Sequence, residues 1–192
     1  MALRNQKTRA DYLEWDQNVS LIHRLGRDGN YKFQLLIALG SFLGLRISDL
    51  LEIKWEDILY KDQLYLKEKK TGKERLLRIN NDLKRLIGEA YKSLNPSSPY
   101  IFTNRKGSKL STQYINRKLK DIKQVYNLYV NNFSTHSLRK TFGREYWKRN
   151  GYSDKALIFL GELFNHSNVA TTKKYLGIKD EELLEAYEVL SL

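Results

Sequence analysis

The sequence predicts an α+β domain that is mostly α-helical and carries one small antiparallel β-hairpin. Apolar residues recur at helical spacing over most of the 192 residues, and only residues 63–79 alternate in the manner of paired strands. We find no internal repeat and no low-complexity tract. We therefore expect a single domain over residues 1–192, long enough to bury a hydrophobic core.

The chain is expected to begin with a loose, basic arm at residues 1–11. Residues 15–25 have the apolar spacing of an amphipathic helix, and residues 31–43 are rich enough in apolar side chains to predict a buried helix. Gly44 marks the end of that helix, where a left-handed residue is common. Ser48 is the expected N-cap of a short helix that follows.

A β-hairpin is predicted next, because residues 63–67 and 75–79 alternate apolar and polar side chains around a Thr-Gly turn. The tip of this hairpin is rich in lysine. Asn81 and Thr135 are expected to cap two of the later helices. The later helices are predicted at residues 81–93, 111–126, 136–149, 154–163 and 168–176. A C-terminal tail helix is predicted within residues 178–192.

The net charge indicates the class of partner. The chain has 34 lysine and arginine residues against 22 acidic ones, which gives +12 at neutral pH. A domain this basic usually binds a polyanion, most often nucleic acid, although a basic protein without that function has the same composition.

Several classes of protein are disfavoured. The chain has no cysteine, which excludes disulfides and thiolate metal sites. The N-terminus lacks the apolar core of a secretion signal, and no apolar stretch is long enough to span a membrane. We expect a cytoplasmic, nucleoid-associated protein.

Five residues have types and contexts that suit a phosphodiester substrate: Arg46, His136, Arg139, His166 and Tyr175. Arginine clamps phosphate well, because its planar fork meets two oxygens at once and stays charged. His136 and Arg139 are three residues apart on one predicted helix, so both side chains can face one oxyanion. A phenol with a pKa near 10 needs cationic surroundings or a base, and either histidine could be that base or a phosphate donor.

Lysines on the hairpin tip could protonate the leaving oxygen as general acid. Lys70 is the preferred candidate, with Lys69 and Lys73 as rivals. Taken singly, a surface arginine, a turn lysine or a packed tyrosine is more common than a catalytic one. The argument therefore rests on the complete set.

Together, four motifs resemble the catalytic domain of the tyrosine recombinases, the phage-integrase family of site-specific DNA recombinases. The segment GLRISDLLEIKWEDI resembles the box around the family's first arginine and places Arg46 there, with Asp49 as a supporting acid. KKTGKERLLRI resembles the hairpin lysine segment and favours Lys70. THSLRKTF resembles the His-x-x-Arg box, and LFNHSNVATTKKYLG resembles the last box, which ends in the nucleophile Tyr175. The motifs extend over residues 35–177 in family order.

The resemblance implies a fold of the DNA breaking-rejoining type and a reaction without metal or cofactor. Tyr175 would attack the scissile phosphate, form a 3′-phosphotyrosine and free a 5′-hydroxyl, and a 5′-hydroxyl from a partner duplex would then attack that bond. The implied partners are double-stranded DNA and a homotetramer on two DNA sites, with a monomer in the absence of DNA left open. Further lysines expected to contact DNA, unless they are merely solvated, are Lys69, Lys73, Lys140, Lys173 and Lys174.

The chain departs from the family pattern beside the site. Asn165 precedes His166 where the family usually has glycine, and Lys140 follows Arg139 where histidine is frequent. Only about thirty residues precede the catalytic motifs, so we do not expect the family's N-terminal DNA-clamping domain in this chain. We expect either a fragment of a longer integrase or a short recombinase like the family's minimal DNA invertases.

Two other functions stay open. A metal-dependent nuclease would need carboxylates or histidines clustered at ligand spacing, whereas the histidines here are dispersed and Glu52, Glu56 and Asp57 look like a helix surface. A DNA-binding regulator of the same fold would need the basic face but not the complete catalytic set.

Overall fold

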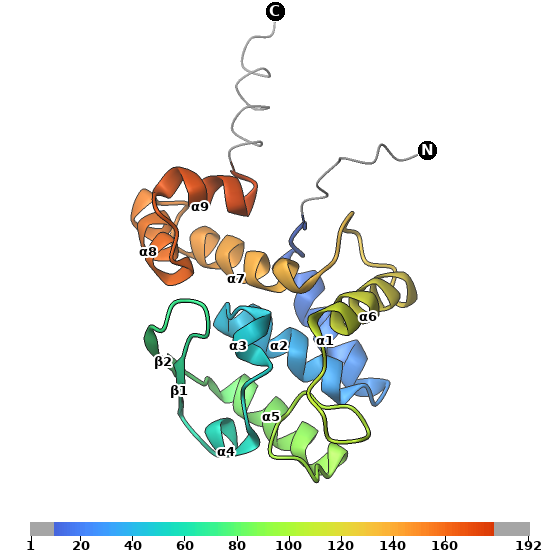
Figure 1. Ribbon diagram of the computed structural model, residues 1–192. Coiled ribbons are helices and arrows are strands. Elements are labelled where there is room, and N and C mark those ends of the chain that lie inside the picture. Colours follow the sequence, from blue (N-terminus) through green and yellow to red (C-terminus); the bar gives the residue numbers. More distant parts are fainter. Residues whose placement is uncertain (1–9, 179–192) are drawn as a thin grey trace, which may run out of the picture.

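Helices and one β-hairpin follow one another along residues 10–178, the part of the chain that the structure, a computed structural model, describes (Figure 1). The helices are α1 (Trp15–Arg27), α2 (Tyr31–Leu43), α3 (Ile47–Leu50), α4 (Trp55–Ile58), α5 (Asn81–Leu94), α6 (Thr112–Val125), α7 (Thr135–Arg149), α8 (Asp154–Phe164) and α9 (Val169–Leu176). The strands are β1 (Gln63–Lys67) and β2 (Glu74–Arg78). The prediction of a mostly helical α+β fold is confirmed.

Helix α2 lies at the centre of the fold and packs against α1, α5 and α7. Its side chains are buried on nearly every face, as expected for a helix that is apolar all round. The polar Ser41 on α2 is buried too, and its hydroxyl accepts a hydrogen bond from the side chain of Asn18 on α1 at 2.9 Å. Gly40 allows α7 to approach closely, because a Cβ there would lie 2.8 Å from a side-chain carbon of Leu138.

Most helix boundaries follow the sequence pattern, but three predicted N-caps are wrong by one or two residues. In each case an earlier residue has the extended backbone that a cap requires, so the helix starts sooner. Asn80 also supplies a side-chain cap, accepting a hydrogen bond from the backbone N–H of Leu83 at 2.9 Å. The observed caps are Asn80, Ser134 and Arg46, in place of the predicted Asn81, Thr135 and Ser48.

The predicted hairpin forms from β1 and β2, which pair antiparallel with Leu64 opposite Leu77 and Leu66 opposite Arg75. Leu64 is buried and joins the hairpin to the core. At the turn, Gly72 has φ 68°, a left-handed conformation that glycine adopts without strain. The hairpin lies beside α3 and below α8 in Figure 1, so its tip is close to the C-terminal helices.

The C-terminal helices enclose a second, smaller apolar cluster. Helix α7 belongs to both clusters, because Leu138 is part of the main core while Phe142, one turn later, packs on the smaller one. This shared helix fixes where α8 and α9 lie relative to α2. The buried members of the smaller cluster are Leu157, Leu160, Phe164, Leu176 and Ile178.

Asp11, at the end of the predicted arm, donates its backbone N–H to the carbonyl of Asn132 at 3.0 Å. Residues 1–9 of that arm and the predicted tail helix lie outside the described residues, apart from Ile178. No helix within residues 10–178 is long and apolar enough to cross a membrane.

Replacing Gly40 with alanine should destabilise the protein, because the new methyl group would lie 2.8 Å from Cδ1 and 3.0 Å from Cβ of Leu138. We expect the free energy of unfolding, measured by urea denaturation, to fall by about 1–3 kcal/mol. Gly88→Ala in α5 is the matched control, since a Cβ there would meet no atom within 4 Å. That substitution should raise stability by up to about 1 kcal/mol. Equal effects of the two changes would contradict the close packing of α2 against α7.

Candidate active site

All six residues predicted to act in the chemistry line one cleft of 380 Å³. They come from the start of α3, the hairpin tip, the first two turns of α7, the loop after α8, and α9. The fold thus brings together segments that are far apart in the sequence. The six residues are Arg46, Lys70, His136, Arg139, His166 and Tyr175.

Arg46 is positioned by the turn that ends α2. Gly44 has φ 61°, and a Cβ there would lie 2.6 Å from the ring of Phe142 on α7, so glycine is needed for both the turn and the packing. Nη2 of Arg46 donates to the carbonyl of Phe164 at 2.7 Å. This bond satisfies a carbonyl in the last turn of α8, where carbonyls lack partners within the helix.

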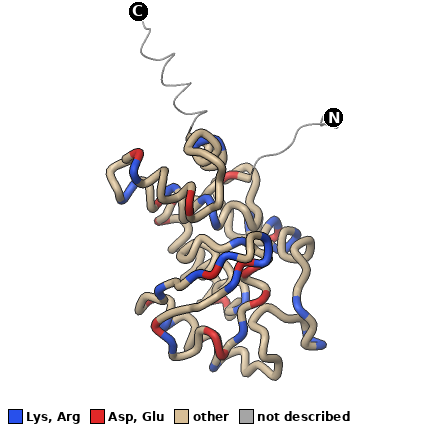
Figure 2. The backbone as a smooth tube through the Cα atoms, turned by 60° about the vertical axis from the view of Figure 1, so that its left-hand side comes forward, with Lys and Arg blue, Asp and Glu red and all other residues tan. Residues whose placement is uncertain are grey.

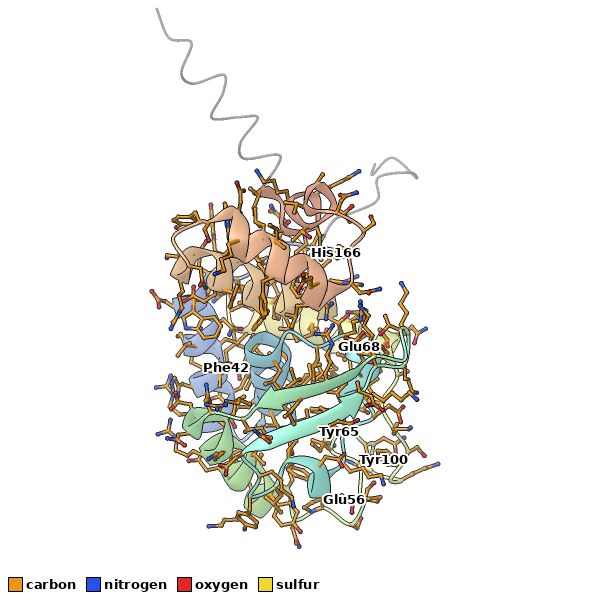
Figure 3. The ribbon with its side chains drawn as sticks, turned by 90° about the vertical axis from the view of Figure 1, so that its left-hand side faces the viewer. Phe42, Glu56, Tyr65, Glu68, Tyr100 and His166 are labelled. Carbon is orange, nitrogen blue, oxygen red and sulfur yellow. The ribbon has the colours of Figure 1, made fainter. Side chains whose placement is uncertain are left out.

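Glu68, which directly follows β1, is absent from the predicted set, yet it holds two arginines at the cleft. Its side chain is 0 % exposed, and it accepts a hydrogen bond from Nη1 of Arg46 at 2.7 Å and pairs with Nε of Arg75 at 2.6 Å. The hydroxyl of Thr71 donates to the same carboxylate at 2.7 Å. Burial raises the pKa of Glu68, but the Thr71 hydrogen bond and the charges of Arg75 and Arg46 outweigh it, so the pKa lies below its ordinary value. In Figure 3, Glu68 on the hairpin lies just below the segment that carries His166.

Arg139 on α7 is a buried cation, with 5 % of its surface exposed. Its Nη1 donates to the carbonyl of Gly44 at 2.6 Å, and its guanidinium carbon lies 4.2 Å from the ring centroid of Phe164. Within the described residues, its buried Nη2 has no hydrogen-bond partner. Burial lowers the pKa of Arg139 to about 10, so the guanidinium remains charged at neutral pH. A desolvated cation with an unused donor is suited to bind an anion.

Tyr175 on α9 packs edge-on against Phe164 and His166, with ring centroids 5.5 Å and 5.2 Å away. Its hydroxyl is buried and has no hydrogen-bond partner among residues 10–178. Burial raises the pKa of Tyr175 to about 12, against the lowering effect of the positive charges on Arg139 and Arg46. The phenol is therefore protonated at neutral pH in this state.

Both histidines line the cleft and the wider groove beside it. Nδ1 of His166 lies 3.1 Å from the hydroxyl of the buried Thr172, a contact that the sequence motifs do not indicate. His136 lies at the rim, on the first turn of α7. Partial loss of water lowers the pKa of each histidine, and the charge of Arg139 lowers it further. Both imidazoles are therefore neutral at pH 7 and able to accept a proton.

The departure at Asn165 has a structural explanation. Asn165 ends α8 with φ 54° and ψ 51°, which is the left-handed region. Glycine adopts this conformation freely, and asparagine is among the few other residues that tolerate it. The turn is closed by the N–H of His166, which donates to the carbonyl of Gly161 at 2.8 Å. Asparagine therefore preserves the turn that presents His166.

Asp49, the predicted supporting acid, contacts the hairpin. Its Oδ1 accepts a hydrogen bond from the backbone N–H of Lys69 at 3.0 Å, which fixes the segment leading into Lys70. The ammonium group of Lys69 pairs with Glu52 at 2.5 Å. Lys70 is exposed and lines the cleft, whereas Lys69 does not. Of these two lysines, the structure therefore places Lys70 at the cleft.

A wider groove of 700 Å³ adjoins the cleft and shares His136, His166 and Tyr175 with it. Two lysines expected to contact DNA, Lys140 and Lys174, line this groove. Two lysines that the motifs do not indicate line it as well, Lys120 and Lys123 of α6. The other expected contacts line neither the cleft nor the groove, and these are Lys69, Lys73 and Lys173. Figure 2 shows basic and acidic residues interspersed along the hairpin at the centre of the view.

No group of three histidine, aspartate or glutamate side chains within residues 10–178 is arranged to hold a metal ion. The acidic side chains at residues 52–57 instead contact lysine residues. Glu52 pairs with Lys69 and Lys109, Glu56 pairs with Lys54, and Asp57 accepts a hydrogen bond from the Lys54 backbone.

Known proteins share this sequence pattern. The chain matches the phage integrase family over residues 12–182. It is 32% identical over 161 residues to the probable integrase/recombinase YoeC of Bacillus subtilis (strain 168), a match that covers 83% of this chain and 85% of that protein. It is 29% identical over 167 residues to tyrosine recombinase XerA of Pyrococcus horikoshii, covering 85% of this chain and 56% of that one. The chain thus spans most of the first relative and about half of the second.

Solved structures share the fold. The crystal structure of XerA recombinase matches with a TM-score of 0.71 and 24% identity, over 94% of this chain and 65% of that one. XerH site-specific recombinase bound to its palindromic difH substrate, in a post-cleavage complex, matches with a TM-score of 0.70 and 20% identity, over 96% of this chain and 55% of that one. The structural likeness agrees with the sequence match over residues 12–182, and this chain belongs to the phage integrase family.

Proposed function

We propose that this protein cuts and rejoins DNA as a tyrosine-type site-specific recombinase. One observation carries the proposal: two arginines, two histidines, a lysine and a tyrosine from separate segments line a single cleft. Relatives named integrase/recombinase and tyrosine recombinase support the same activity. The XerH neighbour is bound to its DNA substrate, which supports DNA as the partner.

In the proposed reaction, the hydroxyl oxygen of Tyr175 attacks the phosphorus of the scissile phosphodiester. A bond from this oxygen to phosphorus forms as the bond from phosphorus to the 5′ oxygen breaks, which gives a 3′-phosphotyrosine and a free 5′-hydroxyl. Lys70 donates the proton that the leaving oxygen takes up. A 5′-hydroxyl from a partner duplex then attacks the phosphotyrosine and restores a phosphodiester. The energy of the broken bond is kept in the link, so the steps require neither a metal nor a nucleotide.

The two arginines bind the phosphate and stabilise the charge that develops on it. Arg139 has the unused buried donor Nη2, and its pKa of about 10 keeps it charged. Arg46 uses two of its N–H groups on Glu68 and Phe164, and a guanidinium has five, so further donors are left for an anion. Donors fixed before the substrate arrives are effective, because they need no reorganisation during the reaction.

His166 is the better placed base for Tyr175. The two rings lie 5.2 Å apart, and Nδ1 of His166 is engaged with the hydroxyl of Thr172. If Nδ1 carries the proton and donates to that hydroxyl, Nε2 is the acceptor nitrogen. Since the pKa of Tyr175 is about 12, the phenol must lose its proton as it attacks rather than beforehand. His136, at the rim, is then the additional donor to the phosphate.

The proposed partner is double-stranded DNA, and the proposed assembly is a homotetramer on two DNA sites, as the family resemblance implies. The charge of +12 and the groove lined by Lys140 and Lys174 suit a duplex next to the cleft. A DNA-binding regulator and a metal-dependent nuclease are the competing functions. No contact within residues 10–178 favours either, and the first experiment below separates them from a recombinase.

A nicked suicide duplex that contains a recombination site should form a covalent adduct with the wild-type protein in the presence of EDTA. Tyr175→Phe should abolish the adduct, because it removes only the attacking oxygen. The adduct is measured as a band resistant to denaturation on an SDS gel, with Tyr129→Phe, a change at an exposed tyrosine outside the cleft, as the control. An adduct that persists in Tyr175→Phe, or cleavage that needs magnesium, would show that the proposed mechanism is wrong.

The two cleft histidines should titrate below their ordinary pKa of 6.5, because partial burial and the charge of Arg139 disfavour the imidazolium form. Their C2 proton shifts in the free protein can be followed by NMR, with His136→Asn and His166→Asn to assign the signals. Since the unfolded histidines bind protons more readily, these residues should also reduce the free energy of unfolding as the pH falls below 6.5. A midpoint above 6.5 for either residue would contradict the described environment.

DNA affinity should fall steeply with salt, because phosphate contacts release bound counterions. Lys174→Ala should reduce the slope of log K against log salt concentration by about 1, since this lysine lines the groove beside the cleft. Lys92→Ala, at an exposed lysine on α5 that lines neither hollow, is the matched control and should leave the slope unchanged. Fluorescence anisotropy with a labelled duplex measures both, and equal slopes for the two variants would argue against this groove as the DNA site.

A further inference from the structure

We propose that Glu68 is a positioning residue that holds the lysine-bearing tip of the hairpin against Arg46 and so places Lys70 at the leaving oxygen. The inference rests on the proposed function, because it assumes that Lys70 and Arg46 act in DNA cleavage. Glu68 does not line the cleft and belongs to none of the four sequence motifs.

The contacts of Glu68 join the hairpin to the rest of the cleft. One oxygen of its carboxylate accepts from Nη1 of Arg46 at 2.7 Å, and the other lies 2.6 Å from Nε of Arg75. Arg46 and Arg75 in turn donate to the carbonyls of Phe164 and Leu163 in the last turn of α8. A single buried carboxylate therefore lies between the start of α3, strand β2 and the end of α8.

The charges around Glu68 explain why a carboxylate is needed there. Arg46, Arg75 and the buried Arg139 are all positive, and Glu68 is the buried acid that contacts the first two. Without a negative charge, the two arginines would repel each other in a site that is shielded from water. We expect the hairpin to move with Arg75 in that case, whereas Arg46 stays hydrogen-bonded to the carbonyl of Phe164.

The tip that carries Lys70 is fastened on both sides of this residue. On one side, the backbone N–H of Lys69 donates to Asp49 at 3.0 Å. On the other side, the hydroxyl of Thr71 donates to Glu68 at 2.7 Å, and the N–H of Gly72 donates to the Glu68 carbonyl at 2.9 Å. Lys70 itself is exposed, so the position of its ammonium group depends on these backbone attachments.

A residue that only stabilises the fold and a residue that positions the acid have different kinetic consequences. An acid is needed when the leaving group is an alkoxide, but a thiolate leaves without protonation, because the thiol pKa is about 8.5. In a duplex with sulfur in place of the bridging 5′ oxygen, the Tyr175 oxygen still bonds to phosphorus while the phosphorus–sulfur bond breaks. A defect in the placement of Lys70 should be relieved by this substrate.

The test compares single-turnover cleavage of oxygen and sulfur suicide duplexes by wild-type protein, Glu68→Gln and Lys70→Ala. Glutamine keeps the size of the side chain and removes its charge. We expect Glu68→Gln to cleave the oxygen duplex about 10- to 100-fold more slowly than wild type, with most of the rate recovered on the sulfur duplex, as for Lys70→Ala. DNA affinity should change little, because Glu68 does not line the cleft.

Glu74→Gln on the same hairpin is the matched control, because that residue is exposed, and it should cleave both duplexes at the wild-type rate. Thr71→Val is the second variant, used in case Glu68→Gln does not fold. It keeps the charge of Glu68 but removes the hydroxyl that ties the tip to it, so it should give the same pattern with a smaller loss. Circular dichroism confirms that each variant is folded.

The outcomes are distinct. A folded Glu68→Gln that cleaves the oxygen duplex like wild type, or that loses equal rate on both duplexes, would overturn the positioning role. If Glu68→Gln does not fold, a Thr71→Val protein without a selective loss on the oxygen duplex would overturn it too. If wild-type protein forms no adduct with either duplex, the proposed recombinase function fails instead, before any variant is compared.

Discussion

The structure around the cleft depends on how three arginine side chains are kept partly or fully out of water. Arg46, Arg75 and Arg139 carry like charges, and each needs compensation. The compensation comes from the Glu68 carboxylate, the Phe164 ring, and backbone carbonyls at the ends of α2 and α8. Most of these contacts join segments that are far apart in the chain, and the pair of Glu68 and Arg75 links the end of β1 to β2. Charge compensation therefore fastens the hairpin, α7 and α8 to the turn after α2, while Nη2 of Arg139 has no hydrogen-bond partner among the described residues.

Tyr175 lies near two of the same arginines, Arg139 and Arg46. Burial and positive charge act on its pKa in opposite directions. Its hydroxyl is buried without a hydrogen-bond partner in the described part of the chain, which favours the neutral phenol and raises the pKa to about 12. The nearby guanidinium groups act in the other direction but do not outweigh burial. The phenol is therefore neutral at pH 7 in this state.

Much of the fold was predictable because local patterns specify it. The buried α2 and the hairpin were predicted with nearly the observed bounds, since apolar density and alternation are properties of the segments themselves. Helix caps were less predictable, because the choice between neighbouring residues such as Asn80 and Asn81 depends on which backbone is extended. Asn165 was noted as a departure from glycine, but its acceptability became clear only from its left-handed φ of 54°.

The sequence by itself predicted most elements of secondary structure, although not α4, together with the basic character of the surface and the six residues that were expected to meet. Their order and local contexts were sufficient for this, since each lies in a motif of neighbouring residues. Only the tertiary structure decided that Glu68, Arg75 and Thr172 belong beside them and that Lys70, not Lys69, lines the cleft. The physical reason is that most of these assignments come from contacts between distant segments, while the contact of Thr172 with His166 depends on how the turn after α8 leads into α9. Glu68 and Arg46 are 22 residues apart and Arg46 and Phe164 are 118 apart, and no periodic pattern in a single chain encodes such pairs.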